Sequence, residues 1–131
     1  MPVPDHLVPD DMLVVPCRRE FAAAARQFVC DRCDRSAPEP AGAAWLVANA
    51  LTAHAISRPR PAAWLALVVH VQPDAVLLDV TERDLPAGPA IPPVPPHLTL
   101  LLDVLTRTWT TRAGPGRDLS TWCVCGHLTH R

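Results

Sequence analysis

The chain has no lysine and no tyrosine, and its aromatic residues are limited to four tryptophans and two phenylalanines. All twelve basic residues are therefore arginines, which stand against thirteen acidic residues and give a formal net charge of −1. This balance offers no basic face and disfavours nucleic acid as a direct partner. The arginine bias, the sixteen prolines and the abundant alanine are typical of a GC-rich genome and carry no mechanism.

Signals for export and for membrane insertion are also lacking. Residues 1–11 contain proline and aspartate and no basic region before an apolar core, so they do not form a secretory signal. The long uncharged stretches 40–57 and 85–102 are interrupted by polar residues or by six prolines, so neither predicts a membrane span. We therefore expect a cytoplasmic protein. Five cysteines, an odd number, argue against a disulfide framework.

The length of 131 residues, about half of them apolar, predicts a single domain (1–131) with one core and a flexible tail over 1–11. Period-two alternation predicts strands, and a 3.6-residue period predicts helices. The order predicts an α/β fold, a two-layer α/β sandwich with a mostly antiparallel sheet and about three helices on one face. We expect Trp64 and Trp122, both on strands, to serve the core. The expected strands are 12–15, 64–71, 75–82, 109–112 and 119–125, the expected helices are 18–35, 41–56 and 98–107, and the proline-rich 85–96 is expected to be extended.

An asparagine stands inside the most apolar of these helices. Asn49 follows Trp45-Leu46-Val47-Ala48, although asparagine prefers caps and turns to helix interiors. One reason for such a residue is Mg²⁺, which takes oxygen ligands and accepts an amide oxygen. The other is a buried side chain that is hydrogen-bonded to a neighbouring loop. Taken without context, the sequence favours the second.

Four of the cysteines form two close pairs, Cys30 with Cys33 and Cys123 with Cys125. Each pair can present both thiols on one face of its element, and four thiolates can hold a structural Zn²⁺. The spacing departs from that of common zinc sites, so the sequence favours buried, reduced cysteines over zinc. Whether the two pairs meet in space is left open.

Three segments, 46–50, 77–82 and 100–116, together resemble the GHKL or Bergerat-fold (histidine kinase-like) ATPases. The branch that they resemble most is the anti-sigma-factor serine/threonine kinases and their stand-alone relatives in high-GC bacteria. The resemblance covers roughly residues 12–124. It implies a Bergerat-like fold and a site for ATP with Mg²⁺.

Residue by residue, the resemblance implies a nucleotide site that has lost parts. Asn49 matches the Mg²⁺-binding asparagine, and Glu82 matches the acid that accepts a hydrogen bond from adenine. Arg117 and Thr121, on the final hairpin, keep part of the family's pattern, in which Arg117 would reach a phosphate. The alternative is that Arg117, a single arginine beside a turn, is a solvated surface charge. The family's catalytic glutamate, four residues before the asparagine, is replaced by Trp45, which cannot accept a proton.

Other departures weaken the site further. None of the four residues after Glu82 is glycine, and Pro95 and Pro96 stand where the family has glycines that cradle phosphate at a helix N-terminus. His54 lies one residue beyond the position of the family's histidine, so no role is transferred to it, and a place at the solvent or at the core edge is expected. These losses argue against catalysis and put ATP and Mg²⁺ binding in doubt.

The resulting hypothesis is a non-catalytic or weakly nucleotide-binding regulatory protein that acts by protein–protein binding in transcriptional control. The partner implied by the resemblance is a sigma factor, an anti-sigma antagonist or a DNA-binding regulator, with no direct nucleic acid contact, and a homodimer is left open. The alternatives are an active serine/threonine kinase of the anti-sigma type and a zinc-stabilised binding domain.

Overall fold

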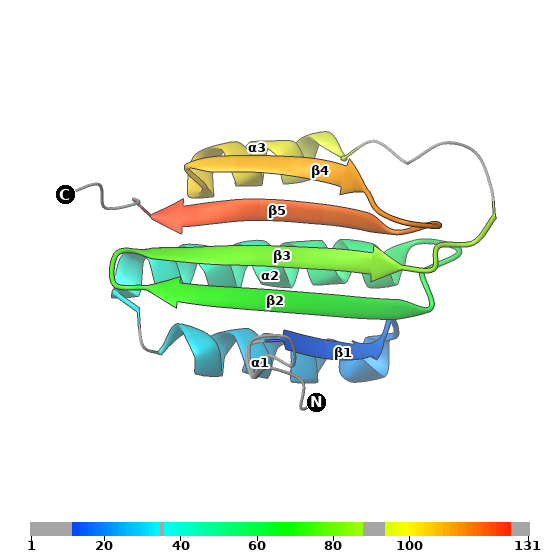
Figure 1. Cartoon of the computed structure of the whole chain (residues 1–131), viewed down its shortest axis with the longest axis horizontal. Helices are drawn as coiled ribbons and strands as arrows, with labels where there is room; N and C mark the ends of the chain where they lie inside the picture. The colour runs from blue at the N-terminus through cyan, green and yellow to red at the C-terminus, as the bar shows by residue number, and fades with distance from the viewer. Residues whose placement is uncertain (1–11, 35, 88–93, 127–131) are drawn as a thin grey trace, which may run out of the picture.

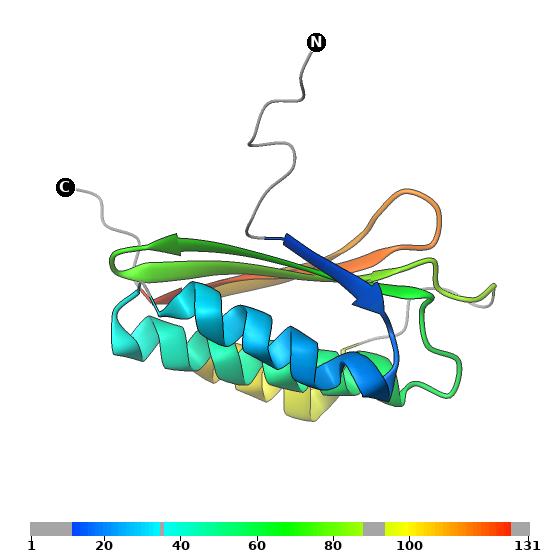
Figure 2. The ribbon, with the colours of Figure 1, turned by 90° about the horizontal axis from the view of Figure 1, so that it is seen from below.

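The computed structural model describes residues 12–34, 36–87 and 94–126. The predicted tail 1–11, the middle of the proline-rich stretch (88–93), and residues 127–131 lie outside this part of the chain. The described residues confirm the predicted two-layer α/β fold, with a five-stranded antiparallel sheet and helices on one of its faces (Figures 1 and 2).

The sheet has the strand order β1-β2-β3-β5-β4, and every neighbouring pair is antiparallel. Its long central hairpin joins β2 and β3, whose registers pair Trp64 with Arg83 at one end and Gln72 with Ala75 at the other. The strands are β1 (Met12–Pro16), β2 (Trp64–Gln72), β3 (Ala75–Arg83), β4 (Thr108–Ala113) and β5 (Leu119–Gly126).

The helical layer consists of α1 (Ala22–Cys33), α2 (Pro38–Ser57) and α3 (Pro96–Leu105), preceded by the short 3-10 helix η2 (Arg19–Phe21). The predicted helix 18–35 is therefore divided at Phe21. Both α2 and α3 begin earlier than predicted, because a proline stands in the first turn of each, where its missing N–H costs no hydrogen bond. α2 contacts α1, α3, β3 and β5, which explains why it is apolar nearly all round.

The alternation in β2 separates the two faces of the sheet as predicted. Leu65, Leu67 and Val69 are buried against the helices, and the same inner face continues across β3 and β5 through Leu78 and Cys123. The core therefore lies between the inner face of the sheet and the helical layer.

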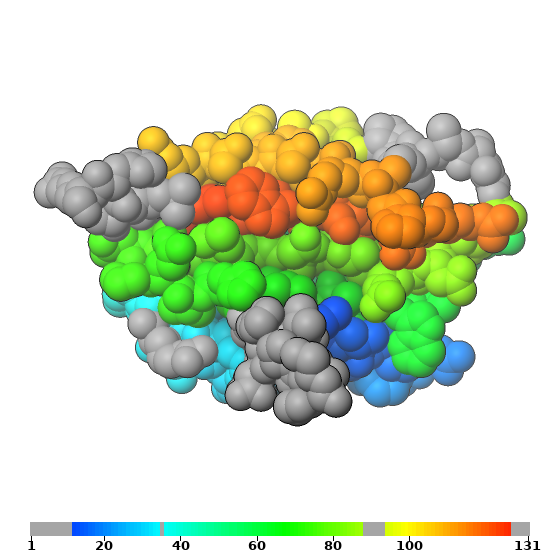
Figure 3. Space-filling view, viewed as in Figure 1, coloured from blue at the N-terminus to red at the C-terminus, as the bar shows by residue number. Residues whose placement is uncertain are grey.

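The prediction that Trp64 and Trp122 serve this core is wrong. The registers place both tryptophans on the outer face of the sheet, which none of the described helices covers (Figure 2). Trp64 is 48% exposed and Trp122 is half-buried. The alternation of β2 predicted that Trp64 and Leu65 lie on different faces of the sheet. It did not indicate which of these two apolar faces packs against the helices. Figure 3 shows this outer face in space-filling form.

The end of β5 is fixed by a close approach of backbone. Gly126 has a φ of +88°, and a Cβ built on it would lie 2.4 Å from the Asp74 carbonyl oxygen and 2.8 Å from Pro40 Cβ. Only glycine fits this position without strain. The contact joins β5 to the β2–β3 hairpin and to the start of α2. In the described part of the chain, no helix is long and apolar enough to cross a membrane.

Candidate functional site

A small cavity lies between the end of α2, the start of α3 and the inner face of β3 and β5. The space in it that the centre of a water molecule can occupy is about 20 Å³. By the same measure a single water needs roughly 10–15 Å³. The cavity thus accommodates water but no nucleotide. Its lining residues are Leu51, His54, Arg58, Val80, Glu82, Val94, Pro95, Leu98, Leu119 and Thr121.

An ion pair between Arg58 and Glu82 occupies one wall of this cavity. Arg58 Nε donates to Glu82 Oε1 at 2.5 Å and Arg58 Nη2 donates to Oε2 at 3.0 Å, so the pair is bidentate. The two side chains are only 13% and 10% exposed. The hydrogen bonds to Glu82 raise the pKa of the Arg58 guanidinium above its ordinary value. Both oxygens of this carboxylate are therefore already engaged by a planar donor fork.

Local structure fixes both partners. Arg58 follows the last residue of α2 in an extended conformation, which ends the helix and turns the side chain toward the sheet. Glu82 lies on the inner face of β3, and its register partners on β2 and β5 are the buried Leu65 and Leu119. A carboxylate in such apolar surroundings needs a partner, and Arg58 supplies it.

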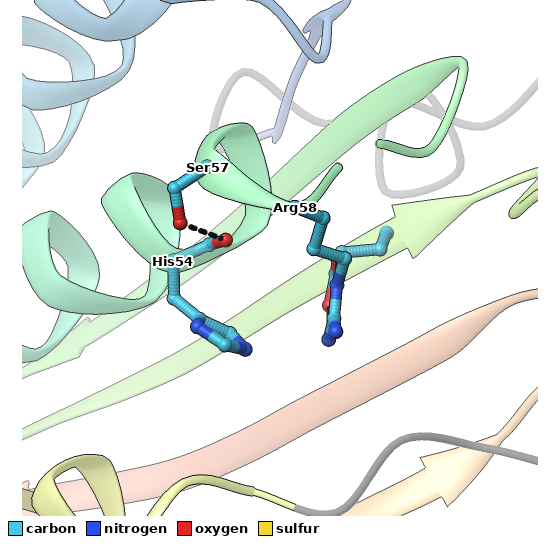
Figure 4. Close-up of polar contacts among 4 residues, drawn as sticks. His54, Ser57 and Arg58 are labelled. Atoms are coloured by element: carbon cyan, nitrogen blue, oxygen red, sulfur yellow. Dashed lines mark hydrogen bonds and ion pairs between the residues drawn. The ribbon is translucent and has the colours of Figure 1, made fainter. Parts of the chain in front are cut away.

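His54 lines the same cavity one helical turn before Arg58, and both side chains extend the same way from the end of α2 (Figure 4). Its backbone carbonyl accepts a hydrogen bond from Ser57 Oγ at 2.9 Å. Burial lowers the pKa of His54 below its ordinary 6.5, and the charge of Arg58 acts in the same direction. The ring is therefore neutral at pH 7. Its Nε2 is buried and has no hydrogen-bond partner among the described residues.

The structure brings together two of the four predicted site residues. Glu82 and Thr121 both line the cavity. Asn49 does not line it, because it lies five residues before His54 and thus about 140° away around the helix. Arg117 is exposed on the β4–β5 turn, where its carbonyl oxygen accepts a hydrogen bond from the Leu85 N–H at 2.9 Å.

Asn49, the predicted Mg²⁺ ligand, shares a helical stripe with Trp45 and Ala53 by the i, i+4 relation. Trp45 is 37% exposed, Ala53 is exposed and Asn49 is half-buried. This stripe is turned away from the cavity that holds Glu82. The residues that face the cavity from α2 are instead Leu51, His54 and Arg58.

The start of α3 offers little to a phosphate. Pro95 precedes the helix and Pro96 is its first residue, so neither supplies a backbone N–H. The amides of Leu98 and Thr99 both donate to the Pro95 carbonyl oxygen at 3.0 Å. These two amides are thus already engaged within the helix, and the two prolines supply no others, as the sequence led us to expect.

The cysteines are reduced, and four of the five are buried. Cys33, at the end of α1, lies close enough to Cys125 on β5 for the two thiols to interact electrostatically, whereas Cys30 is exposed. Burial raises the pKa of Cys33 to about 11, so the thiol keeps its proton at neutral pH. Among residues 12–34, 36–87 and 94–126, no three cysteine, histidine or acidic side chains form a group that could hold a metal ion.

Sequence reasoning missed Arg58 and set His54 aside. Their four-residue spacing on α2 gives a shared face, but nothing in the sequence links that face to Glu82, which lies 24 residues after Arg58.

No protein-family model matches the chain, and no curated protein is significantly similar to it.

Proposed function

We propose that this chain is a non-catalytic regulatory protein that uses a Bergerat-like ATPase scaffold to bind other proteins in transcriptional control. The observation that carries the proposal is the bidentate Arg58–Glu82 pair at the edge of a cavity of about 20 Å³. In the ATPases that the chain resembles, the acid at the position of Glu82 accepts a hydrogen bond from adenine. Here Arg58 already uses both of its oxygens.

Nucleotide binding would require two unfavourable steps. Arg58 would have to leave Glu82, and removing one partner from a buried ion pair typically costs about 3–5 kcal/mol. The cavity would also have to expand greatly, since ligand pockets usually enclose about 300–1,000 Å³. Trp45 replaces the general base, and that assistance alone is typically worth about 10²–10⁴ in rate. These features favour a scaffold over a working kinase.

The resemblance implies a cytoplasmic partner: a sigma factor, an anti-sigma antagonist or a DNA-binding regulator. The test begins with affinity capture of the tagged full chain from its native cell and reconstitution with the candidate from one of these classes. The dissociation constant of the purified pair is then measured with and without Mg²⁺-ATP, and labelled phosphate on the partner is sought. We expect equal affinity and no phosphate on the partner. Nucleotide-dependent affinity or a phosphorylated partner would show that the protein is an active kinase or a nucleotide sensor.

A further inference from the structure

Four loops meet at one end of the sheet, where β1 and β3 end and β2 and β5 begin. Main-chain hydrogen bonds join them: Cys17 N–H donates to Ala63 O at 3.3 Å, and Ala63 N–H donates to Asp84 O at 3.2 Å. The Asp84 N–H in turn donates to Asp118 Oδ1 at 3.0 Å. Asp84 adopts a left-handed conformation with a φ of 62°, which is uncommon outside glycine. This end is therefore a connected surface and not a set of separate loops.

Arginines gather at this end, which we call the arginine end. Its described residues include seven arginines and four carboxylates, a surplus of three positive charges. The opposite end carries two arginines and five carboxylates, a surplus of three negative charges. The arginine end contains Arg18, Arg19, Arg58, Arg60, Arg83, Arg112 and Arg117 with Glu20, Glu82, Asp84 and Asp118, and the opposite end contains Arg32 and Arg107 with Asp31, Asp34, Glu39, Asp74 and Asp103. The near-zero net charge of the chain hides this separation.

Most of these arginines are available to a partner. Within the arginine end, Arg58 is bound to Glu82, and Arg83 lies 3.9 Å from Asp118 as a loose, half-exposed pair. The other five arginines are exposed, and only two other carboxylates, those of Glu20 and Asp84, stand among them. The positive surplus of the end therefore resides on exposed side chains.

An exposed tryptophan lies beside these charges. Trp64 is 48% exposed and Val14 is 44% exposed, and both lie on the outer face of the sheet. They line an open groove of about 380 Å³ together with Arg83, Asp84 and Asp118. Tryptophan and arginine are the residue types most enriched among the residues that dominate binding energy at protein interfaces.

We propose that the arginine end is a docking surface for an acidic segment of a partner protein. An apolar side chain of that segment would rest on Trp64 and Val14, and its carboxylates would face the surrounding arginines. This inference rests on the proposed protein-binding function, for which it names the surface and the chemistry of the partner. Charge complementarity selects the occupant, because the end of the sheet that holds the groove has a surplus of three positive charges on a chain with no overall positive charge, although the lining of the groove itself holds Arg83 with Asp84 and Asp118.

Two other occupants fit less well. A nucleic acid strand carries a phosphate at every nucleotide, and these phosphates would meet Asp84 and Asp118 inside the groove. A second copy of this chain could dock its negative end, but that contact is head-to-tail and would continue into an open chain of molecules. Both occupants give distinct results in the test below.

The test uses the full chain and a fluorescein-labelled peptide of about twelve residues, in which glutamates flank one central phenylalanine, at low salt. A peptide with lysine in place of each glutamate and a labelled oligothymidine of equal length are the controls. We expect the acidic peptide to bind and to quench tryptophan fluorescence, with that quenching absent in Trp64→Phe. We expect Arg18→Glu/Arg117→Glu to weaken binding at least about tenfold, a change of about 1.4 kcal/mol.

The matched control is Arg26→Glu/Arg107→Glu, which changes the net charge equally but lies outside the arginine end, and we expect its affinity to stay within about twofold. Absence of saturable acidic-peptide binding, equal binding of the lysine peptide, tighter binding of the oligothymidine, or equal weakening in the control would each overturn the proposal. A molecular mass that grows with concentration and is abolished by Arg18→Glu/Arg117→Glu would assign the surface to a second copy. None of these results depends on nucleotide, so they are separable from the Mg²⁺-ATP test of the proposed function.

Discussion

Replacing Arg58 by methionine should destabilise the protein strongly, and the structure sets the size of the effect. Arg58→Met keeps the unbranched, apolar stem of the side chain but removes the guanidinium, which leaves the Glu82 carboxylate, 10% exposed, without its bidentate partner. Breaking a buried pair in this way costs about 3–5 kcal/mol. Proton uptake by the unpaired carboxylate sets an upper limit on this loss of stability. A free glutamate has a pKa of about 4.3, so protonating it at pH 7 costs roughly 3.7 kcal/mol, at 1.36 kcal/mol per pH unit. We therefore expect a loss of about 3 kcal/mol in the free energy of unfolding at pH 7.

The same limit gives the prediction a pH dependence. At pH 5 the cost of protonating a free glutamate falls to roughly 1 kcal/mol, so the loss caused by Arg58→Met should shrink accordingly. The double variant Arg58→Met/Glu82→Leu removes both charges and should recover most of the lost stability, since an apolar pair often replaces a buried ion pair without penalty. Arg60→Met, an exposed neighbour, is the matched control and should change stability by less than about 0.5 kcal/mol.

Urea unfolding followed by far-ultraviolet circular dichroism measures these differences, provided that the dependence of the free energy on urea stays the same among variants. A loss below about 1 kcal/mol at pH 7 would refute the reasoning. Equal losses at pH 7 and pH 5 would refute it as well, because the missing charge partner would then not be the cause. A small loss at pH 7 would also mean that a ligand could displace Arg58 at little cost.

Three further predictions concern the backbone at Gly126, the half-buried His54 and Trp45. Gly126→Ala should lower the free energy of unfolding by about 2 kcal/mol or more, because its Cβ would clash with the Asp74 carbonyl at a positive φ. Gly42→Ala, in open space on α2, should raise it by about 0.5–1 kcal/mol, and thermal unfolding of both variants checks these opposite signs. Because the pKa of His54 is lowered in the folded state, the unfolded state binds more protons below pH 6.5, and the free energy of unfolding should fall as the pH drops through that value. Unfolding measured at pH 7.5 and 5.5 should show a smaller fall in His54→Gln than in the wild-type protein. Trp45→Glu places an acid where the ATPases of the proposed scaffold have one, but it should give no phosphotransfer, since Arg58 still holds the carboxylate of Glu82. Labelled phosphate on a partner incubated with this variant would disprove this prediction.

The sequence predicted the sheet well because alternation reports burial directly. In β2, Leu65, Leu67 and Val69 are buried on the face that the alternation puts together, and the turn at residues 72–75 allows only an antiparallel return. The starts of α2 and α3 were predicted three and two residues late, because Pro38 and Pro96 act as first-turn residues and not as breaks. The outward position of Trp64 was missed because both faces of β2 are apolar, and only the helical layer decides which of them is the core.

The candidate site was predictable only in part. Glu82 and Thr121 were chosen from the resemblance, and the register of β3 and β5 brings both of them to one cavity. Asn49 was also chosen from the resemblance, yet it lies five residues before His54, which places it on another side of α2. The partner of Glu82 could not be found, because a contact across 24 residues depends on how the end of α2 meets β3.

Titration calorimetry of the full chain with Mg²⁺-ATP tests the central claim most directly, because the claim is that Arg58 and Glu82 close the space that a nucleotide would need. We predict no saturable heat up to millimolar ATP in the wild-type protein. Saturable binding that is lost in Thr121→Val, a cavity-wall change that keeps the side-chain shape, would contradict the account. It would show that the cavity opens for nucleotide and that this scaffold still senses ATP.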